Sequence, residues 1–332
     1  MRSGKIYYYY DTGDKPRREI PLGDDFPLAV KKWAQLEIAA RPRHLEIVTF
    51  RHVAERYQRE VLPMKAPRTQ RDNLREIAKL YEFFDNPPAP LVQISAQHIR
   101  QYLDWRKKAP VRANREKALF SHIFNKAREW GYTNVANPCQ GVKGFTEKGR
   151  DIYIEDWVYH AVWNAADWPT RDAMDLAYLT GQRPADVLKL RMTDLKNGSL
   201  SITQNKTGKK IRITVEGELL ALIERIQGRT YKVTSLALIR NESGQPLSYF
   251  ALDNRFEEAR SKAAKVLIAQ KREPEAATVL AIQFRDLRAK AGTDKADATD
   301  IRSAQQQLGH KSIKTTETYV RSRMGERVKP TK

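Results

Sequence analysis

Cysteine is almost absent from this sequence: Cys139 is the only one in 332 residues. A single cysteine excludes an internal disulfide, and it cannot build a zinc or iron–sulfur site that needs several thiolates. Long hydrophobic runs are absent too, because no stretch approaches the ~18 uncharged apolar residues of a membrane-spanning helix. The N-terminus has no apolar signal-peptide core. We therefore expect a cytoplasmic protein that does not enter a membrane.

Motifs of the common catalytic machineries are also missing. The 6 histidines are scattered and no two are spaced i, i+4, which excludes a His-Glu-x-x-His zinc site. The sequence has no Gly-x-Ser-x-Gly nucleophile turn, no Gly-x-Gly-x-x-Gly dinucleotide loop and no close carboxylate cluster for a two-metal nuclease. We expect any enzymatic activity to need no metal, nucleotide or other cofactor.

Acidic residues are too few to balance the basic ones. The chain has 60 Lys plus Arg against 40 Asp plus Glu, a formal net charge of +20. Residues 1–37 are almost balanced, with 7 basic and 6 acidic side chains, whereas residues 38–148 carry 21 and 11 and residues 149–332 carry 32 and 23. A nucleic acid held between two basic segments would explain this, since each neutralised phosphate releases counterions. The alternative is a charged surface that serves only solubility.

The first segment, residues 1–40, is predicted to form a small sheet and one helix. Residues 5–10 are a β-prone aromatic run, residues 11–14 are typical of a turn, and residues 17–22 can form a return strand. Pro27 opens a helix-like run that continues to residue 40. We expect at least half of the four consecutive tyrosines to pack in the core of this segment.

The middle segment, residues 41–142, is expected to be a helical bundle. Between residues 49 and 135, four runs of apolar residues recur at i, i+3 and i+4, with Arg and Lys on the opposite faces. Thr49 and Ser95 are candidate N-caps of two helices, and the run Asn86-Pro-Pro interrupts the helical pattern between them. The pattern predicts that the aromatic residues of this segment pack in the bundle core.

The last segment, residues 150–332, is expected to combine helices with one hairpin. Residues 200–204 and 211–215 alternate as strands do, and residues 205–210 connect them. Helical periodicity predicts further helices over residues 216–227, 249–269 and 274–292. The whole chain is therefore predicted to be mainly α with small β-sheets, an α+β fold.

Transfer of a phosphodiester is a chemistry that needs neither metal nor nucleotide. A hydroxyl attacks phosphorus, and cations stabilise the charge that spreads over the phosphate oxygens. Arginine suits this role because it stays charged and can bind phosphate through two N–H groups. If the nucleophile is tyrosine, a phosphotyrosine ester keeps the bond energy, and a DNA hydroxyl can reverse the step without ATP.

Four motifs in the last segment resemble those of the tyrosine recombinases, the phage integrase family. The first arginine box of that family is similar to the run Thr180-Gly-Gln-Arg-Pro-Ala-Asp-Val-Leu-Lys-Leu190. The second is similar to Asp286-Leu-Arg288, and the hairpin lysine of the family matches Lys206. The box that holds the nucleophile resembles Leu308-Gly-His-Lys-Ser-Ile-Lys-Thr-Thr-Glu-Thr-Tyr-Val320. All four occur in the family's order, which makes the resemblance specific.

Carried over residue by residue, the resemblance implies a role for each matching side chain. Tyr319 would be the nucleophile that forms a 3′-phosphotyrosine bond, and Arg183 and Arg288 would hold the scissile phosphate. Lys206 would protonate the departing 5′-oxygen, and His310 would donate a hydrogen bond to the phosphate.

Two assignments within these motifs need further comment. Lys209 and Lys210 lie on the same connection as Lys206, so the lysine assignment is ambiguous, and Lys206 is favoured because it lies nearest the first strand. Asp186 occupies the acidic position of the first box and is expected to orient Arg183 rather than to touch DNA.

One position departs from the family pattern. The family usually has His three residues before the second arginine, where this chain has Arg285. A guanidinium is a poor base because it stays protonated. Arg285 would instead supply positive charge beside the phosphate or favour ionisation of the phenol, and either water would act as the base or proton removal would be less assisted.

The resemblance also covers the rest of the chain. Residues 41–142 are similar to the family's core-binding, SAM-like domain, residues 1–40 resemble its arm-type DNA-binding segment, and residues 150–332 correspond to its mixed α/β catalytic domain. The implied function is site-specific recombination or integration of double-stranded DNA at core and arm sites. The implied assembly is a homotetramer on two synapsed sites, with DNA-bending accessory proteins as further partners, on the nucleoid of a bacterial host.

Two other functions remain open at this point. A type IB topoisomerase uses the same chemistry as a monomer, but relaxation of supercoils does not need an arm-type segment. A DNA-binding regulator that kept the fold and lost cleavage is the second alternative, and Arg285 is the reason to consider it.

Overall fold

The structure is a computed structural model that describes residues 6–12, 15–40, 48–231 and 235–320. The chain divides into two compact units, residues 1–148 and residues 149–332. The division falls within the linker expected between the middle and last segments. The other boundary, expected after residue 40, adjoins residues 41–47, which lie outside the described residues. None of the helices in the described ranges has the length and apolar character needed to cross a membrane.

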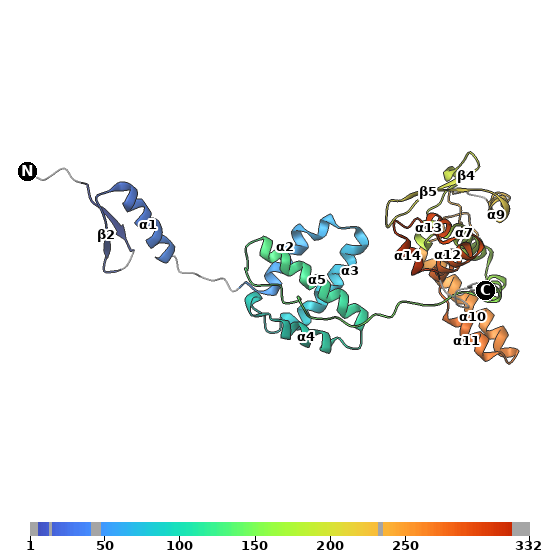
Figure 1. Cartoon of the computed structure of the whole chain (residues 1–332), viewed down its shortest axis with the longest axis horizontal. Helices are drawn as coiled ribbons and strands as arrows, with labels where there is room; N and C mark the ends of the chain where they lie inside the picture. Colours follow the sequence, from blue (N-terminus) through green and yellow to red (C-terminus); the bar gives the residue numbers. More distant parts are fainter. Residues whose placement is uncertain (1–5, 13–14, 41–47, 232–234, 321–332) are drawn as a thin grey trace, which may run out of the picture. The chain divides into compact units, whose positions relative to one another are not determined.

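The N-terminal part of the first unit is a two-stranded antiparallel sheet covered by one helix (Figure 1). Its elements are β1 (Tyr8–Asp11), β2 (Glu19–Gly23) and α1 (Phe26–Ala40). Tyr10 packs with Leu22 and Ala29 in a small core, and Tyr8 lies against it, whereas the side chains of the other two tyrosines are exposed. The predicted sheet and helix are confirmed; one of the four tyrosines is a core residue and a second, partly buried, packs against the core.

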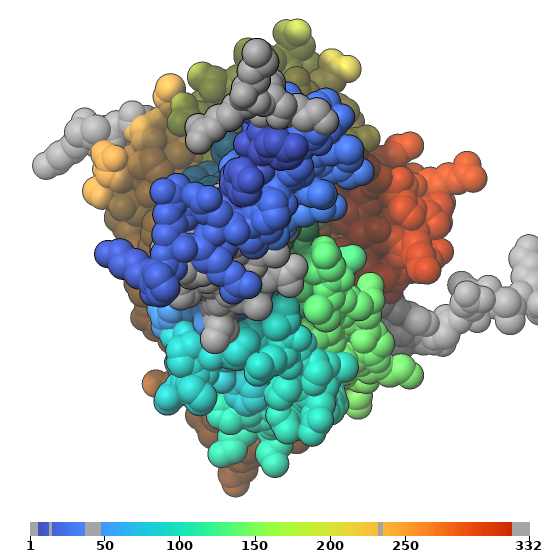
Figure 2. Space-filling model, turned by 90° about the vertical axis from the view of Figure 1, so that its left-hand side faces the viewer, coloured from blue at the N-terminus to red at the C-terminus, as the bar shows by residue number. Residues whose placement is uncertain are grey.

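The surface of α1 retains apolar side chains. Phe26 is 60%, Leu28 56% and Trp33 49% exposed. In the space-filling view the residues of this part are dark blue, and those of the helical bundle that follows along the chain are light blue to green (Figure 2). Because these apolar side chains are exposed, α1 depends on packing against its sheet for stability. Isolated helices of ~12–15 residues are marginal in water.

The rest of the first unit is a bundle of four helices. They are α2 (Phe50–Glu60), α3 (Pro67–Phe84), α4 (Ala96–Trp105) and α5 (Pro110–Glu129). The Thr49 hydroxyl accepts a hydrogen bond from the His52 amide at the start of α2, and Ser95 forms a capping box at the start of α4. Phe50 and Phe120 stack with ring centroids 4.8 Å apart in the core. The four predicted helices and the aromatic core are confirmed.

The second unit is a helical domain with one small sheet. Its helices are α6 (Asp156–Ala165), α7 (Trp168–Thr180), α8 (Pro184–Val187), α9 (Gly217–Gln227), α10 (Tyr249–Ala269), α11 (Glu273–Ala281), α12 (Leu287–Ala298), α13 (Ile301–Leu308) and α14 (Ile313–Glu317). Two 3-10 turns, η3 (Met192–Asp194) and η4 (Phe284–Asp286), precede β3 and α12 respectively. The sheet has the antiparallel order β3 (Leu195–Lys196), β4 (Ser199–Thr203) and β5 (Lys210–Thr214). The predicted hairpin is β4–β5, with Thr203 opposite Lys210.

One predicted helix is wrong in its extent. A continuous helix over residues 274–292 is replaced by α11, a break and α12, which continues to Ala298. Ile282 and Gln283 adopt extended backbone, and the Ile282 side chain lies in the core and is 1% exposed. Gln283 and Asp286 then form a capping box that starts the next turn. The chain is mainly α with small sheets, as predicted.

Candidate active site

The first arginine box lies on a glycine turn at the end of α7. Gly181 follows Thr180 with a φ of +65°, a left-handed conformation that side chains disfavour. A Cβ at this position would lie 3.0 Å from Leu308 Cδ2, so the glycine also allows close packing of α13. The turn places Arg183 at the N-cap of α8. Two separate requirements therefore fix glycine here.

The nucleophile box begins with a second glycine turn. Gly309 ends α13 with a φ of +68°, and His310 follows it. A Cβ on Gly309 would lie 2.6 Å from Ile211 Cδ1 and 2.8 Å from Gln204 Nε2. The absence of a side chain therefore lets the β4–β5 hairpin approach the backbone just before His310.

Arg288 holds the two glycine turns together. It lies on α12 and is 2% exposed. Its Nη1 donates to the Gly181 carbonyl at 2.7 Å and its Nη2 donates to the Leu308 carbonyl at 2.6 Å, whereas its buried Nε has no partner among the described residues. Burial, and then the like charge of Arg183, lowers the pKa of Arg288 to about 10. The guanidinium is still protonated at neutral pH.

His310 is a buried neutral imidazole. It is 8% exposed, and burial with the charges of Arg288 and Arg183 lowers its pKa to about 4. Its Nε2 lies 2.9 Å from Arg288 Nη2 and its Nδ1 lies 3.1 Å from Thr316 Oγ1. Because a guanidinium can only donate, Nε2 accepts, and we assign the proton to Nδ1, which donates to Thr316.

Tyr319 lies beside these two residues. It follows α14, and its amide donates to the Thr316 carbonyl at 2.8 Å. The tyrosine ring centroid is 5.0 Å from the His310 ring centroid and 5.4 Å from the Arg288 guanidinium carbon. The side chain is half-buried, so one part of the ring contacts the protein and another part is accessible. Three candidates from two separate motifs, the second arginine box and the nucleophile box, thus meet at one place.

Arg183 joins this group through polar neighbours. Its Nη1 lies 3.4 Å from Gln204 Oε1 and 3.9 Å from Asp186 Oδ2. Asp186 is 1% exposed, and its other oxygen accepts a hydrogen bond from the Asn205 amide at 2.7 Å. Asp186 therefore lies where it can orient Arg183, as expected, and it also fixes the beginning of the hairpin connection.

The structure does not bring Lys206 and Arg285 into contact with the others. Lys206 is exposed on the connection between β4 and β5, and within the described ranges no hydrogen bond or ion pair joins it to the other candidates. Arg285 is exposed on η4 and lines a cavity of about 380 Å³ together with Tyr249, Asp253 and Glu257 of α10. Its contacts with the remaining candidates are likewise absent from the described part of the chain.

Sequence reasoning missed Gln204. This residue is 1% exposed and contacts both the first arginine box and the turn before His310. One signal was available: Leu200, Ile202 and Gln204 alternate on the inward-facing register of the strand and its extension, so a polar side chain occupies a core position. Such a side chain requires buried hydrogen-bond partners.

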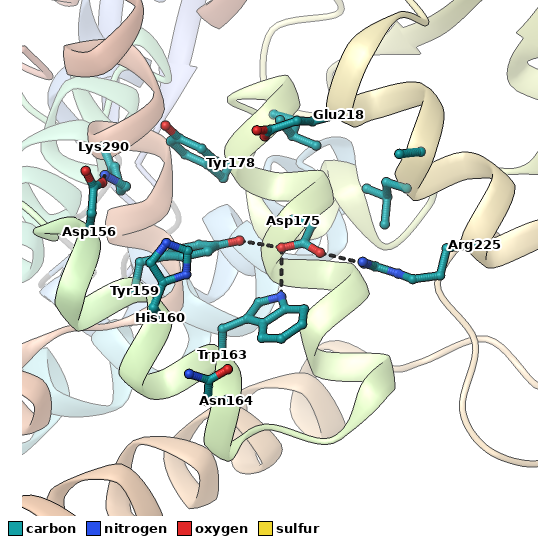
Figure 3. Close-up of a pocket in the computed structure, with 13 residues that line it drawn as sticks. Asp156, Tyr159, His160, Trp163, Asn164, Asp175, Tyr178, Glu218, Arg225 and Lys290 are labelled. Atoms are coloured by element: carbon teal, nitrogen blue, oxygen red, sulfur yellow. Dashed lines mark hydrogen bonds and ion pairs between the residues drawn. The ribbon is translucent and has the colours of Figure 1, made fainter.

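A separate cavity of about 720 Å³ lies among α6, α7 and α9 (Figure 3). In it Asp175 of α7 accepts hydrogen bonds from Tyr159 Oη at 2.5 Å, Trp163 Nε1 at 2.9 Å and Arg225 Nη2 at 2.5 Å. Lys290 of α12 is 1% exposed and pairs with Asp156 of α6 at 2.5 Å. None of the candidate site residues lines this cavity. The contacts in this cavity instead fix α7, the helix that precedes Arg183, and α12, the helix that carries Arg288.

The described ranges contain no group of three or more His, Cys, Asp or Glu side chains that could hold a metal ion. Cys139 is buried in the first unit, and burial raises the pKa of its thiol to about 11. What the site offers is a phenol beside permanent positive charge and a neutral imidazole.

Comparison with known families identifies the class of protein. Residues 156–326 match the model of the phage integrase family. The match covers all the candidate site residues, including Arg183, Lys206, Arg288, His310 and Tyr319. The chain therefore belongs to the phage integrase family, and it is a tyrosine recombinase, a DNA strand-transfer enzyme that acts at specific sites.

Individual relatives resemble the chain over nearly its whole length. The integrase of Escherichia phage HK022 is 25% identical over 97% of this chain and 92% of its own length. The integrase of Escherichia phage lambda is 25% identical over 96% and 91% respectively. A crystal structure of a lambda integrase dimer bound to a COC′ core site is similar in fold, with a TM-score of 0.71 and 23% identity over 99% of this chain and 96% of that one.

Proposed function

We propose that this chain cuts and rejoins double-stranded DNA at its own target sites with Tyr319 as the nucleophile. The Tyr319 oxygen forms a bond to the scissile phosphorus, and the bond from phosphorus to the 5′-oxygen breaks. Lys206 gives the departing oxygen its proton, and the phenol proton passes to water. A 5′-hydroxyl from a partner strand then attacks the phosphotyrosine: its proton returns to Lys206, the bond from phosphorus to the Tyr319 oxygen breaks, and the phenolate regains a proton from water. The phosphodiester is restored, and no ATP or metal is consumed.

The observation that carries this proposal is the orphan donor of Arg288 beside the Tyr319 ring. A buried N–H without an acceptor costs about 1–3 kcal/mol, and Arg288 Nε is such a group in the described structure. A phosphate oxygen is a strong acceptor that would satisfy it. Arg183 has a side chain 23% exposed, so a second guanidinium is accessible to the same phosphate.

His310 needs a change of hydrogen bonding to donate to the phosphate. Its Nε2 is placed to accept from Arg288. We propose that the phosphate takes over this Arg288 N–H and that the imidazole proton then moves to Nε2. The low pKa of His310 supports a neutral imidazole in both states, because protonation would put a third positive charge beside two guanidiniums.

Arg285 is proposed to act through its charge. Arg285 is exposed, although Leu287, two positions later, is buried in the core. A bound phosphate backbone could therefore reach Arg285 without displacing core residues. Replacing Arg285 by Ala should then weaken DNA binding and reduce its salt dependence, because each cation that leaves the interface lowers the number of released counterions.

The partners and assembly are proposed from charge and from relatives. Relatives include a lambda integrase dimer bound to a core site and a lambda integrase tetramer bound to a Holliday junction. We propose that residues 41–142 and 150–332 grip core DNA, that residues 1–40 bind arm sites, and that four copies act on two synapsed sites with DNA-bending proteins as helpers. The place of action would be the cytoplasm of a bacterial host, at the nucleoid.

Covalent trapping from a random library tests the reaction and selects the target sequence in one experiment. Wild-type protein is incubated with nicked duplexes of random sequence, and adducts that survive denaturation are isolated and sequenced. We expect adducts with wild type and none with Tyr319→Phe, which should bind the selected duplex with equal affinity. If wild type binds the random duplexes but forms no adduct with any of them, a regulator that has lost cleavage is favoured. A plasmid carrying two selected sites then separates recombination from simple relaxation of supercoils.

A further inference from the structure

Gln204 makes four polar contacts at the junction of three candidate motifs. Its Oε1 accepts from Thr207 Oγ1 at 2.8 Å and faces Arg183 Nη1 at 3.4 Å. Its Nε2 donates to Gln182 Oε1 at 2.8 Å and to the Leu308 carbonyl at 2.9 Å. A single buried amide thus connects the first arginine box, the hairpin connection that carries Lys206, and the turn before His310.

The Leu308 carbonyl makes Gln204 a link between both arginines. That oxygen accepts from Gln204 Nε2 and also from Arg288 Nη2, which donates at 2.6 Å. Arg183 lies against the other end of the same amide. The two guanidinium groups are therefore bridged through one side chain, which is 1% exposed.

Only an amide satisfies this position. Its NH₂ group supplies two donors to two carbonyl-type oxygens, and its oxygen supplies acceptors to a hydroxyl and a guanidinium. Gln182 is also 1% exposed and extends the chain of amides, with its Nε2 donating to the carbonyls of Thr180 and Gln307 at 2.8 and 2.9 Å. A carboxylate at position 204 would repel the Leu308 carbonyl and draw Arg183 away from a phosphate.

We propose that Gln204 is a positioning residue for strand cleavage, which holds Arg183 and Arg288 at the separation that the scissile phosphate requires. This inference rests on the proposed function, in which those two arginines bind that phosphate. Gln204 itself need not touch DNA. Loss of its amide should leave duplex binding intact and slow the chemical step, because a misplacement of ~1 Å can cost about a hundredfold in rate.

The test compares full-length wild type with Gln204→Met and a matched control, Gln270→Met. Methionine keeps the length of the side chain and removes every polar contact. Gln270 is an exposed residue at the C-terminal end of α10, remote in the chain from each candidate motif. The probe is the nicked duplex selected by covalent trapping with wild type. The measurements are duplex affinity, melting temperature and the single-turnover rate of adduct formation at saturating duplex.

A second duplex separates positioning from a general structural effect. In it a methyl group replaces one non-bridging oxygen of the scissile phosphate, which removes the negative charge that the arginines neutralise. For Gln204→Met we expect a loss of about 30- to 100-fold on the phosphate duplex. On the neutral duplex the loss should shrink to about threefold, since little charge stabilisation remains to be lost. Affinity should stay within about threefold of wild type, and Gln270→Met should match wild type throughout.

Gln204→Glu keeps the test valid if the methionine variant does not fold. The carboxylate has the same shape, keeps an acceptor for Arg183 and lacks both donors. We expect it to slow adduct formation on the phosphate duplex by at least about tenfold, again with a smaller loss on the neutral duplex.

The outcomes distinguish this inference from the proposed function. If wild type forms no Tyr319-dependent adduct, the proposed function fails and the role of Gln204 falls with it. If wild type forms adducts and the position-204 variants match its rate, only the inference on Gln204 is overturned. Equal losses on the two duplexes also overturn it, because they indicate a structural role without specific placement of charge.

Discussion

Acidification should destabilise the second unit through His310, and the structure sets the size of the effect. The pKa of this buried imidazole is lowered to about 4, against 6.5 for an unperturbed histidine. Above the unfolded value both states are neutral and nothing changes. Between the two values the unfolded chain binds a proton that the folded chain excludes, so the free energy of unfolding falls as pH falls. From pH 7 to pH 5 this loss amounts to about 2 kcal/mol.

The assay is urea unfolding of wild type and His310→Gln at both pH values, followed by far-ultraviolet circular dichroism. Other groups also respond to pH, including Glu76, whose pKa burial raises, and His122, whose pKa burial lowers. They are present in both proteins, so the difference between the two pH responses isolates His310. The transition of the first unit serves as an internal reference. Equal responses of the two proteins would refute the argument that Arg288, Arg183 and burial keep His310 neutral.

Three further predictions follow from single positions. Lys206→Ala should slow cleavage by about 10²- to 10⁴-fold, whereas Lys209→Ala should leave the rate unchanged. A 5′-thiol leaving group departs without needing a proton, so it should restore the rate of Lys206→Ala. Failure of that rescue would argue against Lys206 as the acid. Gly309→Ala forces a side chain into a left-handed turn against Gln204, and it should cost about 1–2 kcal/mol in urea unfolding; an unchanged midpoint would contradict the turn. Lys290→Met removes a buried cation from Asp294, whose side chain is 24% exposed, and from Asp156, whose side chain is 72% exposed, and it should cost about 1 kcal/mol, measured the same way; a gain in stability would mean that burying the charge outweighs its pairing.

The sequence predicted the secondary structure wherever the hydrophobic periodicity agreed with the capping and helix-breaking residues. The four bundle helices follow from i, i+3, i+4 stripes, from the caps Thr49 and Ser95, and from the proline break after Asn86. The hairpin follows from alternation on either side of a polar connection. The long helix expected over residues 274–292 was wrong because periodicity alone does not register the break at Ile282 and Gln283, where a capping box between Gln283 and Asp286 starts a new turn.

The residues of the candidate site also fall into two groups, those identified from the sequence and those that only the structure revealed. Resemblance to family motifs identified Tyr319, Arg183, Arg288 and His310, and the structure brings Arg288, His310 and Tyr319 within contact and Arg183 next to them. It leaves Lys206 exposed and apart, on a connection in which Asp186 accepts from the Asn205 amide and Gln204 accepts from the Thr207 hydroxyl. Gln204 belongs to no motif that the sequence displayed.

The sequence by itself determined the local elements, the balance of charge and the family to which the chain belongs, because each of these depends on residues near one another in the chain or on composition. Only the tertiary structure decided which side chains share a buried environment. The tautomer of His310 depends on Arg288, 22 residues away in the chain, and Gln204 contacts the Leu308 carbonyl across 104 residues. Hydrogen bonds and pKa values depend on distance and burial in space, and no local pattern encodes either.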